Sequence, residues 1–174
     1  MLKNCRKNKG FTLLELLVVV LIIGILASIA LPQYKLTVGK AKFASMKDIT
    51  KSLAASSQRY YMASGAWPRK IEDLDIDLDV KNSWFDAYFK IKLNSGENCE
   101  LWVEGQQNLV ACTKKILKTD MVYYVDKSSL KSVSCLVWST DKTDFANRLC
   151  QQETGKTANQ ARCNNDTGYC DYVY

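Results

Sequence analysis

An almost wholly apolar stretch of 21 residues, Phe11 to Leu31, constrains the fold of this chain more than any other feature. As a helix rising about 1.5 Å per residue, it would span about 31 Å, close to the roughly 30 Å hydrocarbon core of a bilayer. Glu15 carries the only ionisable side chain within it. Because an acid inside a membrane helix costs about 3 kcal/mol, this carboxylate indicates a function and a partner of opposite charge. The sequence therefore predicts a single membrane pass.

A segment of ten residues, four of them basic, precedes the apolar stretch. Lys3, Arg6, Lys7 and Lys9 carry four positive charges there, and no acid accompanies them. Because positively charged flanks stay on the cytoplasmic side, we expect residues 1–10 to remain inside and the bulk of the chain to be exported. In a secretory signal peptide the apolar region comes before the cleavage site, whereas here it follows the basic segment. Cleavage at the junction would therefore leave the anchor in the mature chain.

The composition excludes most enzyme chemistry. The chain of 174 residues suits one globular unit and an anchor. It contains no histidine, no phosphate-binding glycine loop and no GxSxG motif, so we expect no catalytic residue, no metal site and no cofactor. The net charge is +6, but the four positive charges of residues 1–10 leave +2 for the rest. The charge therefore indicates no nucleic-acid binding.

The junction between the basic segment and the apolar stretch places Gly10 directly before Phe11, with Glu15 four residues later. This junction resembles the processing site of the type IV pilins and of their relatives, the type II secretion pseudopilins. In that family a short basic leader ends in Gly, the new N-terminal Phe is methylated, and Glu is the fifth residue of the mature chain. Gly24 and Pro32 also match residues typical of the family's apolar segment.

The resemblance implies how the chain is processed and assembled. Prepilin peptidase would cut after Gly10, Phe11 would be N-methylated, and Glu15 would neutralise the N-terminus of a neighbouring subunit in a filament. The segment from Gly24 to Pro32 would be able to lose helical structure there. Further implied partners are other copies of the chain or related pilins and an inner-membrane assembly platform. The implied location is the inner membrane as a single-pass protein, and then a cell-surface pilus or a periplasmic pseudopilus.

A second hydrophobic pattern continues the helix beyond the apolar stretch. Apolar residues recur at spacings of three, four or seven and charged residues fall mainly off this stripe, which is typical of a helix docked on a globular core. We expect one helix over residues 11–62, with its transmembrane part at 11–31. Pro32 removes a backbone donor and its ring crowds the carbonyl of Ser28, so a kink or local break is expected there, with Gly24 as a second weak point. The stripe consists of Leu36, Phe43, Met46, Ile49, Leu53, Ser57 and Tyr60.

Residues 63–174 are expected to form a globular, β-rich domain. Gly65 and Pro68 end the helix, and five short β-rich runs follow, separated by turn residues. The predicted fold class is α+β, with the long N-terminal helix packed on an antiparallel β-sheet and a disulfide-rich C-terminal region. Alternating acids from Asp73 to Asp79 indicate a solvated face, with a calcium site as the weaker alternative. The expected strands are 88–93, 99–104, 109–117, 121–125 and 132–138, followed by a short helix at 143–149.

Six of the seven cysteines lie in the second half of the chain, and the seventh, Cys5, lies in the leader. An even number in an exported domain indicates disulfides, whereas zinc is disfavoured because the chain has no CxxC pair and no histidine. We expect neighbours along the chain to be joined. A hairpin across residues 105–108 would bring the first pair together, and a link from Cys150 to Cys163 or Cys170 is the alternative. The expected pairs are Cys99–Cys112, Cys135–Cys150 and Cys163–Cys170.

Three functions are consistent with these features, and a pilus subunit is the favoured one. A type II secretion pseudopilin is the first alternative, but major pseudopilins usually carry a calcium-binding loop near the end of a shorter domain. This chain has six downstream cysteines and no such loop. The second alternative, an uncleaved single-pass protein with a periplasmic binding domain, does not explain why Gly10, Phe11 and Glu15 occur together.

Overall fold

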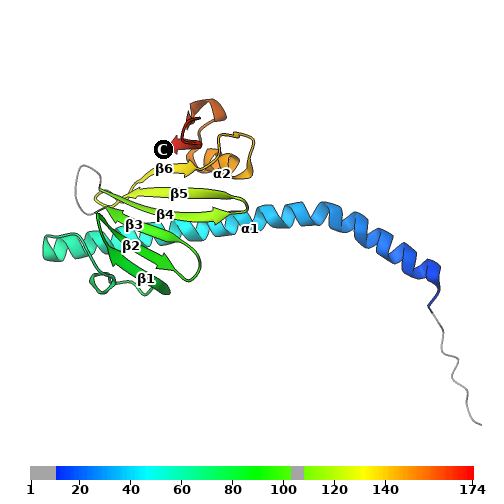
Figure 1. The fold of residues 1–174 in the computed structure, drawn as a ribbon, viewed down its shortest axis with the longest axis horizontal. Coiled ribbons are helices and arrows are strands. Elements are labelled where there is room, and N and C mark those ends of the chain that lie inside the picture. The colour runs from blue at the N-terminus through cyan, green and yellow to red at the C-terminus, as the bar shows by residue number, and fades with distance from the viewer. Residues whose placement is uncertain (1–10, 103–107) are drawn as a thin grey trace, which may run out of the picture. The chain divides into compact units, whose positions relative to one another are not determined.

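The computed structural model describes residues 11–102 and 108–174 (Figure 1). The chain divides into two compact units, of which the first ends at Thr37 and the second begins at Val38. Helix α1, Leu13–Ser64, begins in the first unit and ends in the second. It stops where Gly65 adopts a left-handed conformation, with φ of 74°, and donates its N–H to the carbonyl of Tyr61 at 2.8 Å. Glycine suits this position because it has no Cβ to clash. The predicted long helix and its glycine stop are confirmed.

In its described residues, the second unit contains an eight-stranded antiparallel sheet. The strand order is β1-β2-β3-β4-β5-β6-β8-β7, so the first six strands form a meander and the chain then returns to pair β8 with β6. The predicted α+β class, with an antiparallel sheet, is confirmed. The strands are β1 (Val80–Phe85), β2 (Tyr88–Leu93), β3 (Asn98–Trp102), β4 (Leu109–Ile116), β5 (Thr119–Asp126), β6 (Ser132–Val137), β7 (Arg162–Asn164) and β8 (Tyr169–Val173).

Several elements differ from the sequence-based expectation. Strands β1, β7 and β8 were not predicted, because β1 has no apolar alternation and β7 has only three residues. The short helix α2 spans Phe145–Thr154, later than the predicted 143–149, since Asp144 is its N-cap and Gly155, with φ of 70°, ends it. Residues 103 and 104 of the expected strand 99–104 lie outside the described residues. Two single turns of 3-10 helix, Ile71–Asp73 and Ala158–Gln160, complete the fold.

The amphipathic stripe of α1 forms one side of the core in the second unit. Phe43, Met46 and Leu53 are buried, and the ring of Phe43 meets that of Tyr123 edge-on at 6.0 Å between centroids. Ser57 is also buried, and its hydroxyl donates to the carbonyl of Leu53 at 2.7 Å. A hydroxyl satisfied within its own helix avoids the desolvation cost of an unpaired polar group. The docked stripe predicted from the spacing is therefore confirmed for these residues.

Gly39 allows the helix to approach its neighbours closely. A Cβ built at this position would lie 2.6 Å from Cε1 of Phe145, at the start of α2, and 3.5 Å from Cγ2 of Ile116. Any side chain here would displace the ring of Phe145. The sequence pattern did not single out Gly39, because a glycine on an apolar stripe does not reveal what it faces.

Three disulfides join the cysteines as nearest neighbours along the chain, which is the pairing expected from the sequence. Cys99 and Cys112 lie directly opposite one another on β3 and β4, with their Cα atoms 4.0 Å apart. Cys135–Cys150 ties β6 to α2 across a Cα separation of 5.6 Å. The third bridge, Cys163–Cys170, crosses the β7–β8 hairpin at 4.0 Å. Residues 103–107, which include most of the expected hairpin connection at 105–108, lie outside the described residues.

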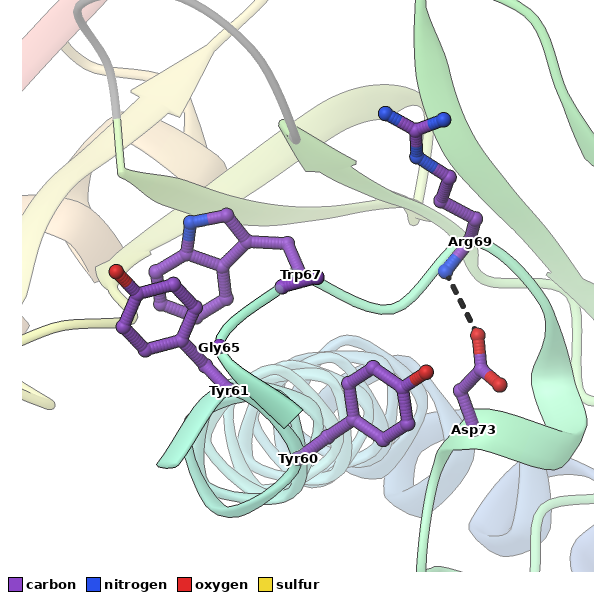
Figure 2. A pocket seen from close by; sticks show the side chains of 7 residues that line it. Tyr60, Tyr61, Gly65, Trp67, Arg69 and Asp73 are labelled. Atoms are coloured by element: carbon purple, nitrogen blue, oxygen red, sulfur yellow. Dashed lines mark hydrogen bonds between the residues drawn. The ribbon is translucent and has the colours of Figure 1, made fainter. Parts of the chain in front are cut away.

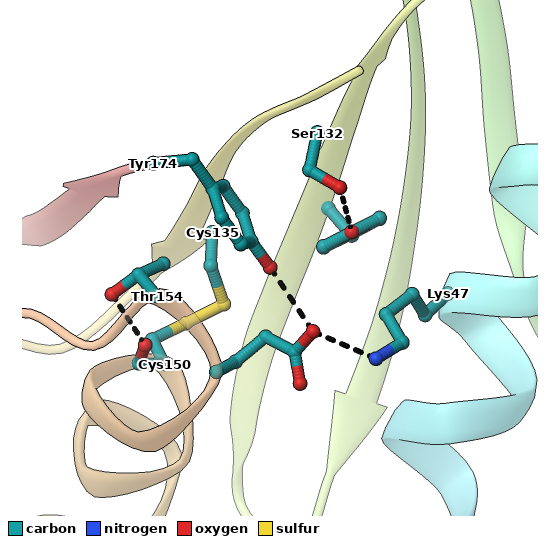
Figure 3. A network of polar contacts seen from close by, with 8 residues as sticks. Lys47, Ser132, Cys135, Cys150, Thr154 and Tyr174 are labelled. Atoms are coloured by element: carbon teal, nitrogen blue, oxygen red, sulfur yellow. Dashed lines mark hydrogen bonds and ion pairs between the residues drawn. A yellow bond between two sulfur atoms is a disulfide. The ribbon is translucent and has the colours of Figure 1, made fainter. Parts of the chain in front are cut away.

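The last residue of the chain is held against the domain by a polar network (Figure 3). The hydroxyl of Tyr174 donates to Oε1 of Glu153 at 3.2 Å, and the same oxygen accepts a hydrogen bond from Nζ of Lys47 at 2.7 Å. These contacts connect the end of the chain, α2 and α1. Beside them, the hydroxyls of Tyr123 and Ser132 lie 2.5 Å apart. The C-terminal residue is therefore packed against the domain.

The alternating acids after α1 face solvent, as expected. Asp75, Asp77 and Asp79 are exposed, whereas Leu74 between them and the end of α1 is buried. Arg59 on α1 holds Asp75 through two hydrogen bonds of 2.5 and 2.6 Å, and this contact keeps the pKa of the Asp75 carboxyl well below its usual range. Among the described residues no cluster of acids is arranged to hold a metal ion.

Candidate assembly segment at the start of the long helix

The apolar stretch is uncovered in the first unit. Every described residue from 11 to 31 is exposed apart from Ala27, which is half-buried, and the side chains of Phe11 and Leu13 are 72% and 82% exposed. Within the described chain, α1 is the helix that is long and apolar enough to cross a membrane. A continuous apolar surface of this extent marks a site of contact with lipid or with other protein surfaces.

A reciprocal cap fixes the start of α1. The backbone N–H and the hydroxyl of Thr12 both donate to Oε2 of Glu15, at 2.9 and 2.7 Å. In return, the N–H of Glu15 donates to the hydroxyl of Thr12 at 3.2 Å. Thr12 is thus the N-cap and Glu15 the third helical residue of a capping box, which satisfies backbone donors that the first helical turn leaves unpaired.

Thr12 is a site residue that the sequence analysis did not single out. The signal was available, since Thr followed three residues later by Glu directly before an apolar run is the sequence pattern of a capping box. The cap engages one oxygen of the Glu15 carboxylate, while Oε1 accepts no hydrogen bond from any residue that the structure describes. The carboxylate is therefore oriented by its own subunit and keeps one oxygen open to another group.

The predicted cleavage site is only partly described. Gly10 lies outside the described residues, whereas Phe11 is described and exposed. Phe11 and Thr12 precede the first helical residue, Leu13. Two residues that are not helical therefore separate residue 10 from α1.

The two predicted weak points lie within continuous helix. Pro32 is inside α1, and the helix is unbroken there and at Gly24. The expected local break is therefore not found in the single chain, while the kink stays a prediction. A Cβ at Gly24 would meet no atom within 4 Å, so contacts within the described chain do not require glycine at this position. Gly24 stays a candidate for contact or flexibility within an assembly.

Together these features define a class of protein. An uncovered apolar helix starts with a capping box that contains a carboxylate. The second half of the same helix packs on an antiparallel sheet that is crosslinked by disulfides. This is the organisation of a pilin-like subunit. The sequence comparisons agree, since the profile described as "Prokaryotic N-terminal methylation motif" matches residues 5–31.

The chain belongs to the type IV pilin family. It is 38% identical to a type IV major pilin protein PilE of Neisseria gonorrhoeae over 119 residues, which cover 59% of this chain and 71% of the relative. A type IV major pilin protein PilE1 of the same organism is 28% identical over 135 residues, covering 65% of this chain and 80% of the relative. Type II secretion system core protein G of Pseudomonas aeruginosa is 37% identical over 70 residues, covering 40% of this chain and 49% of that protein. No solved structure matches the chain significantly.

Proposed function

We propose that this chain is a structural subunit of a type IV pilus, made as a prepilin, cleaved after Gly10 and N-methylated on Phe11. The precursor would be anchored in the inner membrane by a single pass. The same apolar segment would later pack against that of neighbouring subunits in a cell-surface filament. Its partners would be prepilin peptidase, other copies of itself or related pilins, and the assembly platform. The chain would have no catalytic role.

The Glu15 carboxylate is the observation that carries this proposal. One of its oxygens is held by Thr12 and the other is open. Cleavage after Gly10 would create an ammonium group on Phe11, and stacking of two helices would bring the ammonium of one subunit to the carboxylate of another. In apolar surroundings, removing one partner of such a pair costs about 3 to 5 kcal/mol, because the other charge is left buried and unpaired. The pair would therefore favour one register of the stacked helices.

The uncovered apolar surface has to be shielded from water at both stages of the proposed assembly. Burial of apolar surface contributes about 25 cal/mol per Å² relative to water, and the exposed side chains of the first unit are almost all aliphatic. In the bilayer this surface is already shielded by lipid. Packing against like helices would keep it shielded after the subunit leaves the membrane, so both states of the proposed cycle cover the same surface.

A pseudopilin of a type II secretion system is the second candidate. The similarity to core protein G of Pseudomonas aeruginosa supports it, because that match includes 40% of this chain. The matches to the gonococcal pilins extend over 59% and 65% of this chain, a larger share than the match to core protein G covers. The six downstream cysteines favoured a pilin over a pseudopilin in the sequence analysis, and the three disulfides that they form in the second unit are consistent with that preference.

The mature N-terminus and the location of the filament test the proposal. Protein recovered from cells should begin with N-methylated Phe11 by mass spectrometry of the N-terminal peptide. Sheared surface material, labelled with an antibody against the second unit and viewed by negative-stain microscopy, should contain labelled filaments.

Each outcome distinguishes the candidates. An intact Met1 would instead support an uncleaved single-pass protein. A methylated Phe11 without surface filaments, together with short periplasmic assemblies, would support the pseudopilin. Gly10→Leu serves as the matched control, because it should block processing without altering the described part of the chain.

A further inference from the structure

Two large apolar side chains are exposed at one end of the sheet in the second unit. Leu117, in the turn between β4 and β5, is 42% exposed, and Trp138, directly after β6, is 50% exposed. The N–H of Trp138 donates to the carbonyl of Asp120, near the start of β5, at 2.9 Å. Both side chains therefore lie at the same end of the sheet. Packing of the apolar stretch in a filament gives them no role.

Leu117 has a backbone conformation that leucine rarely adopts. Its φ is 58°, in the left-handed region. A two-residue connection between strands usually has glycine, asparagine or aspartate where φ is positive, because a larger side chain crowds the backbone there. This turn instead presents an aliphatic side chain to solvent. Strained conformations of this kind are concentrated at functional positions, so the exposed leucine needs an explanation beyond the turn itself.

The groups beside Leu117 are those of a surface that lies on a bilayer. The ring of Tyr169, on β8, meets that of Trp138 with centroids 5.6 Å apart, and tryptophan and tyrosine are enriched where apolar and aqueous phases meet. Lys118 is exposed, and its ammonium group has no hydrogen bond or ion pair to any described residue. Its long stem allows the ammonium to stay among phosphate groups while apolar neighbours insert more deeply. We call this set the tip surface: Leu117, Lys118, Trp138 and Tyr169.

The tip surface lies where the chain enters the second unit. A Cβ built at Gly39, the second residue of that unit, would be 3.5 Å from Cγ2 of Ile116, the last residue of β4, and Leu117 follows directly. Val38, which begins the unit, comes seven residues after Leu31, the end of the apolar stretch. However the two units are arranged, at most about 25 Å of chain separates these two residues. Anchoring by the apolar stretch therefore keeps the tip surface within reach of the membrane.

We propose that the tip surface binds the phospholipid bilayer before assembly, with Leu117 and Trp138 inserted at the boundary between head groups and acyl chains. This inference rests on the membrane pass of the proposed function. Insertion removes both apolar side chains from water, as in other proteins that lie in the interface. Asp120 is exposed beside Lys118, so the surface has both signs of charge and does not require an anionic lipid. The contact would hold the second unit on the membrane until the subunit is extracted.

Quenching of tryptophan fluorescence by brominated lipid tests the contact. The full chain is reconstituted into phosphatidylcholine vesicles, with and without bromine on the acyl carbons nearest the head group. Brominated lipid should quench the wild-type fluorescence, and Trp138→Phe should lose most of that quenching. Leu117→Asn should lose about half of it or more, because the tip no longer inserts. Asparagine suits the left-handed conformation, so Leu117→Asn should be at least as stable to urea as the wild type, which separates the effect from misfolding.

Each variant has a matched control at the opposite end of the sheet. Trp84 is 43% exposed, and the register of β1 to β4 places it there, so Trp84→Phe should keep the quenching. Leu130, between β5 and β6, has a φ of 57° and the same 42% exposure, so Leu130→Asn should keep it too. Trp67 and Trp102 are half-buried, and Nζ of Lys127 lies 4.0 Å from the centre of the Trp67 ring.

Flotation with the vesicles measures the membrane pass separately. A chain that does not float would overturn the membrane pass, and the contact of the tip surface with it. Flotation of a chain whose quenching is unchanged by Trp138→Phe would overturn the contact alone. Equal losses in Leu117→Asn and Leu130→Asn would do the same. Absence of quenching together with a low filament yield from Leu117→Asn would assign the tip surface to a neighbouring subunit instead, against the proposal.

Discussion

At the scale of single residues, three positions each have a role that is defined by contact with a particular neighbour. Thr12 orients one oxygen of Glu15, Gly39 makes room for Phe145, and Lys127 supports Trp67. None of these contacts joins residues of the same chemical type, so the hydrophobic pattern of the sequence does not reveal them. Substitutions at such positions separate local roles from the fold as a whole.

Processing at residue 10 should depend on the size of the side chain. Gly10→Ala should still be cleaved, whereas Gly10→Leu should accumulate uncleaved, because the peptidase of this family requires a small residue before the cut. The mass of the intact protein in membrane fractions measures the ratio of the two forms. Normal processing of Gly10→Leu would remove the assignment of the cleavage site.

The buried ammonium of Lys127 should make stability depend on pH. Burial lowers its pKa to about 8, whereas an unfolded lysine titrates near about 10.4. Between these values the unfolded chain binds more protons than the folded chain, so the free energy of unfolding should rise with pH, by about 3 kcal/mol. Below about pH 8 the cost of burying the charged group is present in full.

The matched variant for this effect is Lys127→Met, which keeps a long side chain and removes the titrating group. Urea unfolding of both proteins, measured from neutral pH to about pH 10, should show the rise in the wild type and not in the variant. An identical slope in the two proteins would assign the pH dependence to other groups.

At the scale of elements, the two helical glycines of α1 should respond in opposite ways. Gly39→Val places a branched side chain against the ring of Phe145, where even a Cβ would lie 2.6 Å from Cε1, and should lower the free energy of unfolding by about 1 to 3 kcal/mol. Gly24→Ala meets no atom within 4 Å and should stabilise the helix by about 0.5 to 1 kcal/mol. Thermal unfolding followed by circular dichroism compares them, and equal loss at both positions would contradict the packing assigned to Gly39.

The disulfide between β6 and α2 should contribute most to stability. Replacing both Cys135 and Cys150 by Ala removes a bridge between two fully buried residues with a separation of 15, which is worth about 3 kcal/mol in the chain-entropy model. The same change at Cys163 and Cys170 should cost less, because their separation is only 7 and Cys163 is only partly buried. Urea unfolding under non-reducing conditions ranks the two variants. A larger loss at the β7–β8 hairpin would show that the tail, and not α2, holds the domain together.

The elements that the sequence predicted correctly are those with strong local signals. The long helix follows from its apolar run, its stripe and the Gly65 stop, and β2 matches its expected bounds because Phe89, Ile91 and Leu93 alternate with polar residues. Strand β1 forms a hairpin with β2, which follows it directly, but β1 itself has no apolar alternation that would have revealed it. Strand β8 pairs with β6, which is distant in sequence, and such a contact leaves no local pattern from which β8 could be predicted.

The same distinction applies to the candidate site. Gly10, Phe11 and Glu15 were identified from a short motif, because the order of these residues along the chain is sufficient to recognise it. The orientation of Glu15 by Thr12 required the coordinates, although the Thr-x-x-Glu pattern was present in the sequence. A hollow of about 460 Å³ where α1 ends (Figure 2) could not be predicted either, because its lining residues Tyr60 and Asp73 come from two separate elements, α1 and the following 3-10 turn.

At the scale of the whole molecule, the two units are built for different surroundings. The first has an uncovered aliphatic surface with one carboxylate, and the second has a closed core crossed by three disulfides. Disulfides persist in oxidising compartments, which agrees with export of the second unit. The proposed assembly therefore depends on the first unit. Its central test asks whether filament formation requires the negative charge of Glu15 or only the helix cap that Glu15 forms.

The variants Glu15→Gln, Glu15→Leu and Thr12→Val separate these two roles. Glutamine can still form a capping box with Thr12 but carries no charge, so Glu15→Gln should keep α1 intact and still assemble poorly, as should Glu15→Leu. Insertion into the membrane should persist in both, because removal of the charge makes it easier. Thr12→Val keeps the charge and loses the hydroxyl that orients it, at about 1 kcal/mol of helix stability, and should give an intermediate yield of filaments. The measurement is the amount of sheared filament relative to membrane-bound subunit. Wild-type yield from Glu15→Gln would show that capping is sufficient, and the proposed pairing of Glu15 with the ammonium of Phe11 would then be wrong.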